Sequence, residues 1–477
     1  MIYMAGQLVS WLVTFVSISW IPRSLGEKGI GQMGLGSAAV FNVGLILSLS
    51  IEQYLTPAVA RNPSEARAML RSTLGMRVAM LPIMLIVCSI ALYGIHADAT
   101  VWALGRLYMV LQAITFFYTP CRNVLVGFEE ARKVALCDLG QVCAGLFMLP
   151  VLHYGVVICV EAWTLANIPV MLWGIWCVYK RVGNIWPTFD FARWWVMIRA
   201  SLAFLVNDVA APIMAYTTVY LLNLYGGGDT TVGVYSQSQK LLGAFLFIPT
   251  AIASALLPSI SRLAETDYPA FRRMQQRVTM LMIVVGMPIL ILALMLAVPF
   301  CSLLYGASKF QALPVALQCC GITVIPLYVT IILYRFLVAE RKNAVWGLFM
   351  FFTMVLNAIL CRLLIPYMML APHIHSGAAG ATISFAITET ISMVAAFILL
   401  KVNPINGESI GRLFRALLAA AAMVGVMWVT PDLFFVLRGA LGMLVFGVLA
   451  WGFKVLGEED QQKLAEIVMK RLPGQKG

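Results

Sequence analysis

The chain has 477 residues, of which 61% are hydrophobic and only 11% are charged, and its formal net charge is +12. A soluble globular domain carries about 25% charged residues. The composition therefore excludes an ordinary water-soluble protein and predicts an all-α polytopic membrane protein.

Taken in chain order, the hydrophobic pattern predicts about fourteen membrane-spanning helices. A bilayer core of about 30 Å requires roughly 20 apolar residues per helix. The apolar runs are 3–22, 32–58, 70–93, 101–126, 134–152, 155–179, 197–222, 232–257, 278–304, 312–337, 343–367, 377–400, 413–430 and 433–455. The runs 134–152 and 413–430 are the weakest, which gives a range of twelve to fourteen spans.

Two of these runs repeat one pattern about 201 residues apart. A glycine, a long apolar run and a closing Pro–x–aliphatic–x–Arg occur as Gly31, Pro57, Val59 and Arg61, and again as Gly233, Pro258, Ile260 and Arg262. Six spans separate the copies, so the repeat is parallel, with its pseudo-twofold axis along the membrane normal. A duplicated membrane half is typical of secondary transporters and predicts a carrier.

The repeat also predicts the domain organisation. We expect two pseudo-symmetric six-helix lobes, a cytoplasmic connector between them, a C-terminal pair of helices outside the duplication, and a cytoplasmic tail with a short surface helix. The corresponding residues are 1–179, 197–400, 180–196, 401–457 and 458–477. Trp186, Phe189, Phe191, Trp194 and Trp195 in the connector suit an interfacial helix or a plain aromatic belt.

The distribution of basic residues predicts the orientation. If both termini are cytoplasmic, 26 of the 33 Lys and Arg residues fall on the inner loops, their edges or the tail, as the positive-inside rule requires. The net charge is then a matter of membrane topology and calls for no nucleic-acid partner. We expect no cleavable signal peptide, because the first apolar run lacks a basic leader and a small-residue cleavage site.

Motifs for catalysis, nucleotide hydrolysis and metal binding are absent from the sequence. We find no phosphate-binding loop, nucleophile elbow or His–Glu–x–x–His motif, and no outer loop longer than about a dozen residues. The ten cysteines lie mostly in or beside apolar runs, which favours buried small hydrophobes over disulfides or a metal site. We therefore expect a protein that is not an enzyme and has no cofactor.

Four further motifs lie at the ends of predicted spans. They are Leu25-Gly26-Glu27-x-Gly29-x-Gly31, Val232-Gly233-Val234-Tyr235-Ser236-x-Ser238-x-Lys240-Leu241, Leu256-Leu257-Pro258-Ser259-Ile260-Ser261-Arg262 and Gly377-Ala378-Ala379-Gly380-Ala381. These motifs resemble those of the polysaccharide-transporter flippases of the multidrug, oligosaccharidyl-lipid and polysaccharide exporter superfamily. The resemblance covers almost the whole chain in span count and repeat. It implies two six-helix lobes around a V-shaped cavity, and flipping of an undecaprenyl-diphosphate-linked oligosaccharide for surface polysaccharides such as O-antigen.

The resemblance also implies a multi-pass protein of the bacterial cytoplasmic membrane. Its partners would be the lipid-linked glycan and the bilayer, with a polysaccharide polymerase and glycosyltransferases as further candidates. One departure concerns coupling: such proteins often carry an acidic residue in span seven a few turns before the second-copy glycine. Here Thr217 and Thr218 stand near that place, and the acid is Asp208.

Charged residues inside spans are costly and commonly face a cavity, so four of them are candidate functional residues. Lys240 could be a cavity cation that binds a diphosphate or acidic sugar, or it could snorkel to the outer surface. Arg77 could draw an anionic head group into the cavity from the cytoplasmic side. Asp208 and Glu389 could carry H⁺ or Na⁺, or serve in pairing and helix–helix hydrogen bonds. Pro169, Pro212, Pro249 and Pro288 are candidate bending points.

Together these features predict a flippase driven by an ion gradient through alternating access. Two rivals share the fold: a multidrug/cation antiporter, which needs midplane carboxylates such as Asp208 and Glu389, and a lipid II-type flippase. A glycan polymerase or assembly scaffold would need a long polar outer loop, which the sequence lacks.

Overall fold

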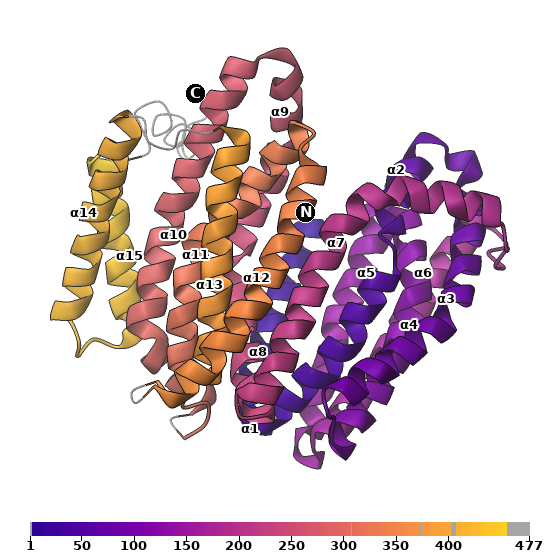
Figure 1. Ribbon diagram of the computed structural model, residues 1–477, viewed down its shortest axis with the longest axis horizontal. Coiled ribbons are helices and arrows are strands. Elements are labelled where there is room, and N and C mark those ends of the chain that lie inside the picture. The colour runs from indigo at the N-terminus through magenta and orange to yellow at the C-terminus, as the bar shows by residue number, and fades with distance from the viewer. Residues whose placement is uncertain (1, 307, 372–373, 402–406, 456–477) are drawn as a thin grey trace. The chain divides into compact units, whose positions relative to one another are not determined.

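The structure is a computed structural model that describes residues 2–306, 308–371, 374–401 and 407–455, without the side chains of 2–12, 203–204, 206–208 and 407–409. All regular secondary structure in the described chain is helical (Figure 1). The elements are α1 (Ile2–Leu47), α2 (Ile51–Arg61), η1 (Pro63–Glu65), α3 (Ala66–Gly94), α4 (Ala99–Gly127), α5 (Ala131–Ala144), η2 (Gly145–Tyr154), α6 (Val156–Val182), α7 (Phe191–Tyr225), α8 (Asp229–Phe245), α9 (Phe247–Thr266), α10 (Tyr268–Tyr305), α11 (Leu313–Ala339), α12 (Asn343–Leu370), α13 (Gly377–Leu400), α14 (Gly407–Val429) and α15 (Phe435–Gly452).

The prediction of an all-α polytopic membrane protein is confirmed. Among the described residues, twelve helices are long and apolar enough to cross a membrane. The element α1 consists of two helical segments joined at Gly26, whose φ of 71° and ψ of −178° are not helical. That left-handed φ favours glycine, and it separates the first two predicted runs. The weak run 134–152 is present as α5 followed by the 3₁₀ segment η2.

The two copies of the repeat have the same local structure. Each repeated span is broken in the middle: residues 48–50 separate α1 from α2, and Leu246 separates α8 from α9. In both closing motifs the aliphatic residue, Val59 or Ile260, is fully buried, whereas the arginine, Arg61 or Arg262, is exposed. Four prolines were predicted to mark bends. Pro249 lies just after the break at Leu246, whereas Pro169, Pro212 and Pro288 lie inside α6, α7 and α10.

A second pair of helix ends repeats as well. At the end of α4, Glu129 has a φ of 58° and the amide of Glu130 donates to the carbonyl of Leu125 at 3.0 Å. At the end of α11, Arg341 has a φ of 59° and the amide of Lys342 donates to the carbonyl of Leu337 at 2.9 Å. Both are the left-handed closing turn of a Schellman cap. The duplication therefore extends to backbone detail in residues that the closing motifs do not include.

The chain divides into two compact units. Unit 1 comprises Met1–Lys240, Leu304–Leu313 and Ala344–Ala381, and unit 2 comprises Leu241–Leu303, Pro314–Asn343 and the described residues from 382 onward. Within unit 1, α7 is attached to α3 by three hydrogen bonds. Trp194 Nε1 donates to the Ser72 carbonyl at 2.9 Å, Tyr216 Oη to Ala91 at 2.9 Å, and Asn223 Nδ2 to Ile95 at 2.8 Å. These units do not coincide with the predicted lobe boundaries, which stay a prediction.

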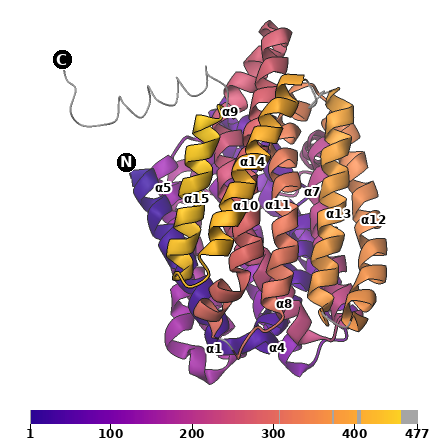
Figure 2. The same ribbon diagram turned by 90° about the vertical axis from the view of Figure 1, so that its left-hand side faces the viewer.

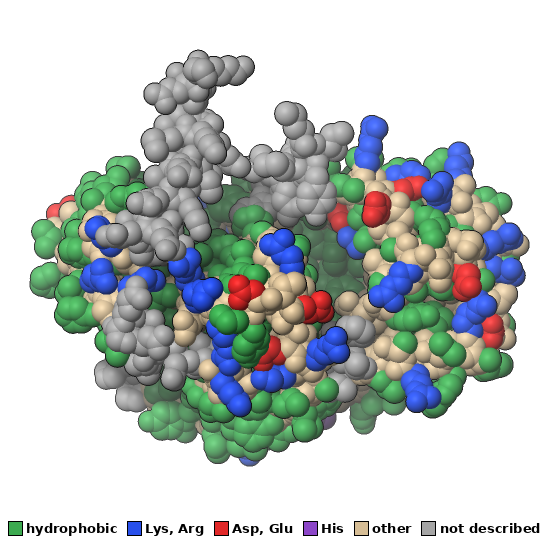
Figure 3. All heavy atoms as spheres, turned by 90° about the horizontal axis from the view of Figure 1, so that it is seen from above, with side chains coloured by type: hydrophobic (Ala, Val, Ile, Leu, Met, Phe, Trp, Pro, Cys, Tyr) green, Lys and Arg blue, Asp and Glu red, His purple; other side chains and the backbone are tan. Residues whose placement is uncertain are grey.

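Basic side chains gather at one end of the helices in each unit, as Figure 3 shows. In unit 1 this end holds the exposed side chains of Arg61, Arg67, Arg132, Lys180 and Arg181, where α2 and α6 end and α3 and α5 begin. In unit 2 the end with exposed basic side chains includes Arg262 and Arg273, where α9 ends and α10 begins. We call this end of each unit its basic end. Its composition is what the sequence predicted for the loops of one membrane side.

Of the two forms predicted for the connector, a separate interfacial helix is not observed between α6 and α7, and the aromatic belt stays a prediction. Residues 183–190 have no regular secondary structure. They are held against α3 by its arginines: Arg71 Nε donates to the Trp186 carbonyl at 2.9 Å, and Arg67 Nε to that of Asn184 at 3.1 Å. Gly183, with a φ of 84°, stops α6 and turns the chain into this segment.

The last two helices pair with each other and with α10 inside unit 2 (Figures 1 and 2). Their shared core is rich in methionine and small residues, and includes Met287 of α10, Ala419 and Met423 of α14, and Phe446 and Ala450 of α15. The predicted C-terminal helix pair is therefore present. The predicted surface helix in the tail 458–477 lies outside the described residues.

Candidate functional site

The two repeat glycines lie against each other where α1 crosses α8. A Cβ atom added to Gly31 would lie 1.7 Å from the Asp229 carbonyl oxygen, and one added to Gly233 would lie 2.0 Å from that of Glu27. Each contacted carbonyl is four residues before the partner glycine, so the crossing is itself two-fold symmetric. Only glycine allows backbones to approach this closely.

Hydrogen bonds surround this crossing at the end of unit 1 opposite the basic end. Gln237, which is fully buried, donates from Nε2 to Tyr305 Oη at 2.7 Å and to the Ile18 carbonyl at 3.2 Å. Lys309 Nζ donates to the Arg23 carbonyl at 2.7 Å. The first segment of α1, α8 and the end of α10 are therefore closed against one another at this end.

Two carboxylates flank the glycine crossing. Gln32 Nε2 donates to Asp98 Oδ2 at 3.2 Å, and Asp229 lies near both groups at the start of α8, ahead of its apolar run. Burial raises the pKa of Asp229, and the charge of Asp98 adds to the shift, while the Gln32 hydrogen bond and Lys28 act against it. Asp229 is therefore protonated more readily than an exposed aspartate.

Arg77, the predicted cytoplasmic-side contact for the substrate, is part of the break between α1 and α2. Its guanidinium donates to the carbonyls of Leu47 at 3.1 Å and Ser48 at 3.0 Å, and it forms an ion pair with Glu52. It also lies 4.3 Å from the centre of the Phe116 ring, and its side chain is only 1% exposed. The last carbonyls of a helix need such donors, so these contacts support a structural role.

The break in the second copy is closed differently. Tyr328 of α11 is fully buried, and its hydroxyl donates to the carbonyl of Phe245, the last residue of α8, at 2.5 Å. A neutral phenol thus occupies the place that an ion pair takes in the first copy. The sequence repeat does not include Arg77 or Tyr328, so pattern matching could not have found this correspondence.

The other predicted cation, Lys240, lies in α8 one turn before its end, where unit 1 gives way to unit 2 along the chain. Its side chain is exposed and forms no ion pair with any described residue. Asp208 lies in the middle of α7, but its side chain is outside the described residues. Among the described residues Lys240 therefore has no ion-pair partner, and the environment of the Asp208 side chain is not described.

Glu389 is 7% exposed in the middle of α13, and its Oε2 atom has no hydrogen-bond partner among the described residues. The neighbouring hydroxyls do not serve it. Thr388 donates to the Phe385 carbonyl at 2.9 Å and Thr390 to the Ala386 carbonyl at 2.7 Å, both in the same helix. A buried carboxyl without a partner is costly, so this position is a strong candidate for an exchangeable ion.

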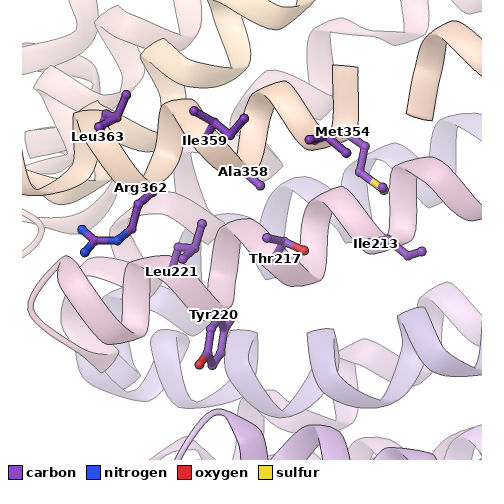
Figure 4. Close-up of a pocket in the computed structure, with 10 residues that line it drawn as sticks. Ile213, Thr217, Tyr220, Leu221, Met354, Ala358, Ile359, Arg362 and Leu363 are labelled. Carbon is purple, nitrogen blue, oxygen red and sulfur yellow. The ribbon is translucent and has the colours of Figure 1, made fainter. Parts of the chain in front are cut away.

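An open groove of about 480 Å³ runs between α7 and α12 within unit 1 (Figure 4). Ile213, Thr217, Tyr220 and Leu221 of α7 line one side, and Ala358, Ile359 and Arg362 of α12 belong to the other. The lining is almost wholly apolar. The sequence analysis did not predict this groove, because it depends on which faces of two distant helices meet. In the part of the chain that the structure describes, no cluster of His, Cys, Asp and Glu could hold a metal ion.

The fold is that of known membrane transporters. A structure described as the lipid II flippase MurJ in an inward closed conformation is similar with a TM-score of 0.68 and 10% identity, covering 94% of this chain and 99% of that one. An inward-facing multidrug resistance MATE family transporter of the MOP superfamily has a TM-score of 0.63 and 14% identity, covering 84% and 97%. At such low identity the likeness concerns the fold alone.

Sequence comparison gives the family. Residues 1–264, more than half of the chain, match the family described as "Polysaccharide biosynthesis protein", and residues 234–449 match that described as "Lipid II flippase MurJ". A Shigella flexneri protein described as "Putative O-antigen transporter" is 21% identical in an alignment of 324 residues that covers 61% of this chain and 72% of that protein. The chain belongs to the polysaccharide biosynthesis protein family, and twelve of its described helices are long and apolar enough to cross a membrane.

We expect Gly31→Ala and Gly233→Ala to force the crossing apart, because each new methyl group would overlap a backbone carbonyl. Overpacking of this kind costs about 1–3 kcal/mol, so the thermal unfolding midpoint of the purified protein in detergent should fall. Gly243→Ala is the matched control, since Gly243 lies in α8, the helix of Gly233, and no atom lies within 4 Å of the Cβ that the substitution adds. Unchanged midpoints in both crossing variants would contradict the contact.

We expect Arg77→Met to destabilise the protein by about 3–5 kcal/mol, because it leaves Glu52 as an uncompensated partly buried charge. Arg77→Met combined with Glu52→Gln should recover much of that loss, as measured by thermal unfolding. A double variant that is stable and transports normally would exclude Arg77 as a substrate contact. A double variant no more stable than the single variant would show that the ion pair is not the relevant interaction.

Proposed function

We propose that this protein is a flippase. It moves an undecaprenyl-diphosphate-linked oligosaccharide from the inner to the outer leaflet of the bacterial cytoplasmic membrane, for surface polysaccharide biosynthesis. It acts as a carrier rather than as an enzyme. The observation that carries the proposal is the match of residues 1–264 to the polysaccharide biosynthesis family. The O-antigen description of the Shigella relative supports the same class of cargo.

The repeat geometry supports alternating access. The two repeat spans touch at one end through Gly31 and Gly233, and each is interrupted halfway, at residues 48–50 and at Leu246. A span with an interruption can bend there while its other half stays packed. In this mechanism the crossing is closed while the cargo enters from the cytoplasmic side, and it separates to release the head group outside.

The polar head group and the apolar tail of the cargo would follow different paths. The diphosphate and sugars would pass through a hydrated cavity, in which Lys240 is the contact for negative charge. Its exposed side chain and the absence of an ion-pair partner in the described structure support that role. The polyprenyl tail would remain in lipid throughout. Arg77 is less well suited to this task, because its donors are already engaged by Glu52 and two carbonyls.

Ion coupling would run through Glu389. Intramembrane carboxyls commonly serve as proton relays in transporters, and Glu389 is buried with an unpartnered oxygen. Asp208 is the second candidate for a coupling role. The basic end would face the cytoplasm, as the positive-inside rule requires, with both termini on that side and a polymerase and glycosyltransferases as partners.

A lipid II-type flippase is the second candidate function. The match of residues 234–449 to the lipid II flippase family favours it. The same match covers the stretch that contains Lys240 and Glu389, so the proposed contacts would serve either cargo. Identification of the lipid that accumulates in a strain without the protein separates the two functions. If the protein were a cation antiporter, neither lipid would accumulate in that strain.

The deciding experiment is deletion of the gene in its host, followed by extraction of the membrane lipids. We expect one defined polyprenyl-diphosphate oligosaccharide to accumulate and to disappear on complementation. Complementation with Lys240→Ala should clear it about tenfold more slowly, the effect of one lost charged hydrogen bond. The matched control is Lys180→Ala, whose ammonium lies 3.9 Å from the Trp176 ring at the basic end. An unchanged lipid pool together with sensitivity to cationic drugs would refute flipping and favour the antiporter.

We expect Glu389→Gln to uncouple transport from the ion gradient, because an amide of the same shape cannot release a proton. In proteoliposomes loaded with the accumulated lipid, flipping by the wild type should accelerate when a proton or sodium gradient is imposed, and flipping by the variant should not. Glu161→Gln, an exposed carboxyl on α6, is the matched control. A variant that responds to the gradient as the wild type does would remove Glu389 from coupling.

A further inference from the structure

The groove between α7 and α12 combines an apolar floor with one unpaired cation. It extends from Ile213 to Leu221 on α7 and from Met354 to Leu363 on α12. At 1.5 Å per residue this is a length of about 12 Å along each helix axis. Side chains four and seven residues apart lie on one face of a helix, so the lining continues along the groove rather than forming a local pit.

A polar clamp holds the two helices together behind the groove. Asn357 is 1% exposed, and its Nδ2 atom donates to Thr218 Oγ1 at 3.0 Å. Thr218 in turn donates to the Met214 carbonyl in its own helix at 2.9 Å. Because both residues are buried and bonded across the helices, the separation of α7 and α12 is fixed, and Ala358 leaves room between them. The groove is therefore a formed feature of unit 1.

Arg362 stands at one end of this groove, near Leu221 and Tyr220 in Figure 4. Its side chain is exposed, and its guanidinium carbon lies 4.1 Å from the centre of the Tyr225 ring. It forms no ion pair and no hydrogen bond with any described residue. A planar guanidinium stacked over an aromatic ring keeps its N–H donors free to bind two oxygens of an anion such as phosphate.

An occupant that matches all of this has one apolar chain and a phosphate head. Lipid surrounds the spans of a membrane protein, so an apolar groove alone would not select an occupant. The cation at its end does, because an anionic head group complements Arg362 while its tail fills the groove. A glycerophospholipid would bring two chains to this one groove between α7 and α12, whereas a polyprenyl phosphate brings a single chain. A polyprenyl phosphate meets both conditions.

We propose that this groove binds the isoprenoid chain of the cargo's lipid carrier, with Arg362 binding its phosphate. The proposal rests on the proposed function, and it names a site that the transport path through a central cavity does not require. In the predicted orientation α12 runs from the basic end to the outer surface, so Arg362 lies in the outer leaflet. The site therefore holds the carrier lipid on the release side.

The test is binding of undecaprenyl phosphate to the purified full-length protein, measured by native mass spectrometry over a titration. Undecaprenol, which lacks the phosphate, and phosphatidylglycerol, which carries two chains, are titrated in parallel. We expect the wild type to prefer undecaprenyl phosphate over both. Arg362→Gln should weaken its binding roughly fivefold, the effect of one interfacial cation, and should leave undecaprenol unchanged.

Ala358→Trp should fill the groove and weaken both isoprenoids about tenfold, which is equivalent to roughly 1.4 kcal/mol or the burial of two methylene groups. Arg106→Gln, an exposed arginine on α4, and Leu348→Trp, a 72% exposed position on α12 outside the groove, are the matched controls. Thermal unfolding in detergent checks that every variant is folded. Arg362→Lys keeps the charge and should bind more tightly than Arg362→Gln.

Equal losses for phosphatidylglycerol and undecaprenyl phosphate in Arg362→Gln would overturn the proposal in favour of a general anionic-lipid site. Full binding in Ala358→Trp would also overturn it. The proposed function fails separately, since it depends on accumulation of a lipid-linked oligosaccharide in the deletion strain. Accumulation without groove binding refutes only the groove, and groove binding without accumulation refutes only the flippase.

Discussion

The close crossing of α1 and α8 is the contact on which the rest of this architecture depends. Gly31 and Gly233 bring two backbones together so closely that neither position has room for a methyl group. Because the two glycines are equivalent members of the repeat and contact each other's helix reciprocally, the crossing has a local twofold symmetry. In the proposed alternating access, the two spans would separate at this point. The duplication is therefore more than an evolutionary record, since it sets where the two spans can touch.

The two interrupted spans differ in how firmly their breaks are held. In the first copy, Arg77 joins two carbonyls and Glu52 across the break, and removal of one partner of such a buried pair costs about 3–5 kcal/mol. In the second copy, Tyr328 contributes one neutral hydrogen bond to Phe245, worth about 1 kcal/mol. The symmetry of the backbone therefore does not extend to the side chains that close its two breaks.

The sequence predicted the fold well because a lipid solvent leaves few alternatives. Apolar runs must be helices in a bilayer, and basic residues must collect on one side, so the span count and the basic end followed from composition and order. The interfacial helix predicted for the connector is absent for a local reason. Arg67 and Arg71 donate hydrogen bonds to backbone carbonyls of residues 183–190, and those residues have no regular secondary structure. The connector's aromatic residues alone could not reveal that α3 would supply the hydrogen bonds.

The functional residues were harder to predict, because a charged residue inside a span can serve either in transport or in holding the structure together. Arg77, Lys240 and Glu389 look alike in the sequence as single charges inside apolar runs. In the structure the Arg77 charge is paired with Glu52, and its terminal nitrogens donate to two carbonyls, although its Nε atom has no partner among the described residues. Glu389 is buried with an unpartnered oxygen and no ion pair, and Lys240 is free of ion pairs in the described chain. A paired buried charge has its cost offset by its partner. An unsatisfied one still needs a partner, and in a transporter that partner can be the cargo or the coupling ion.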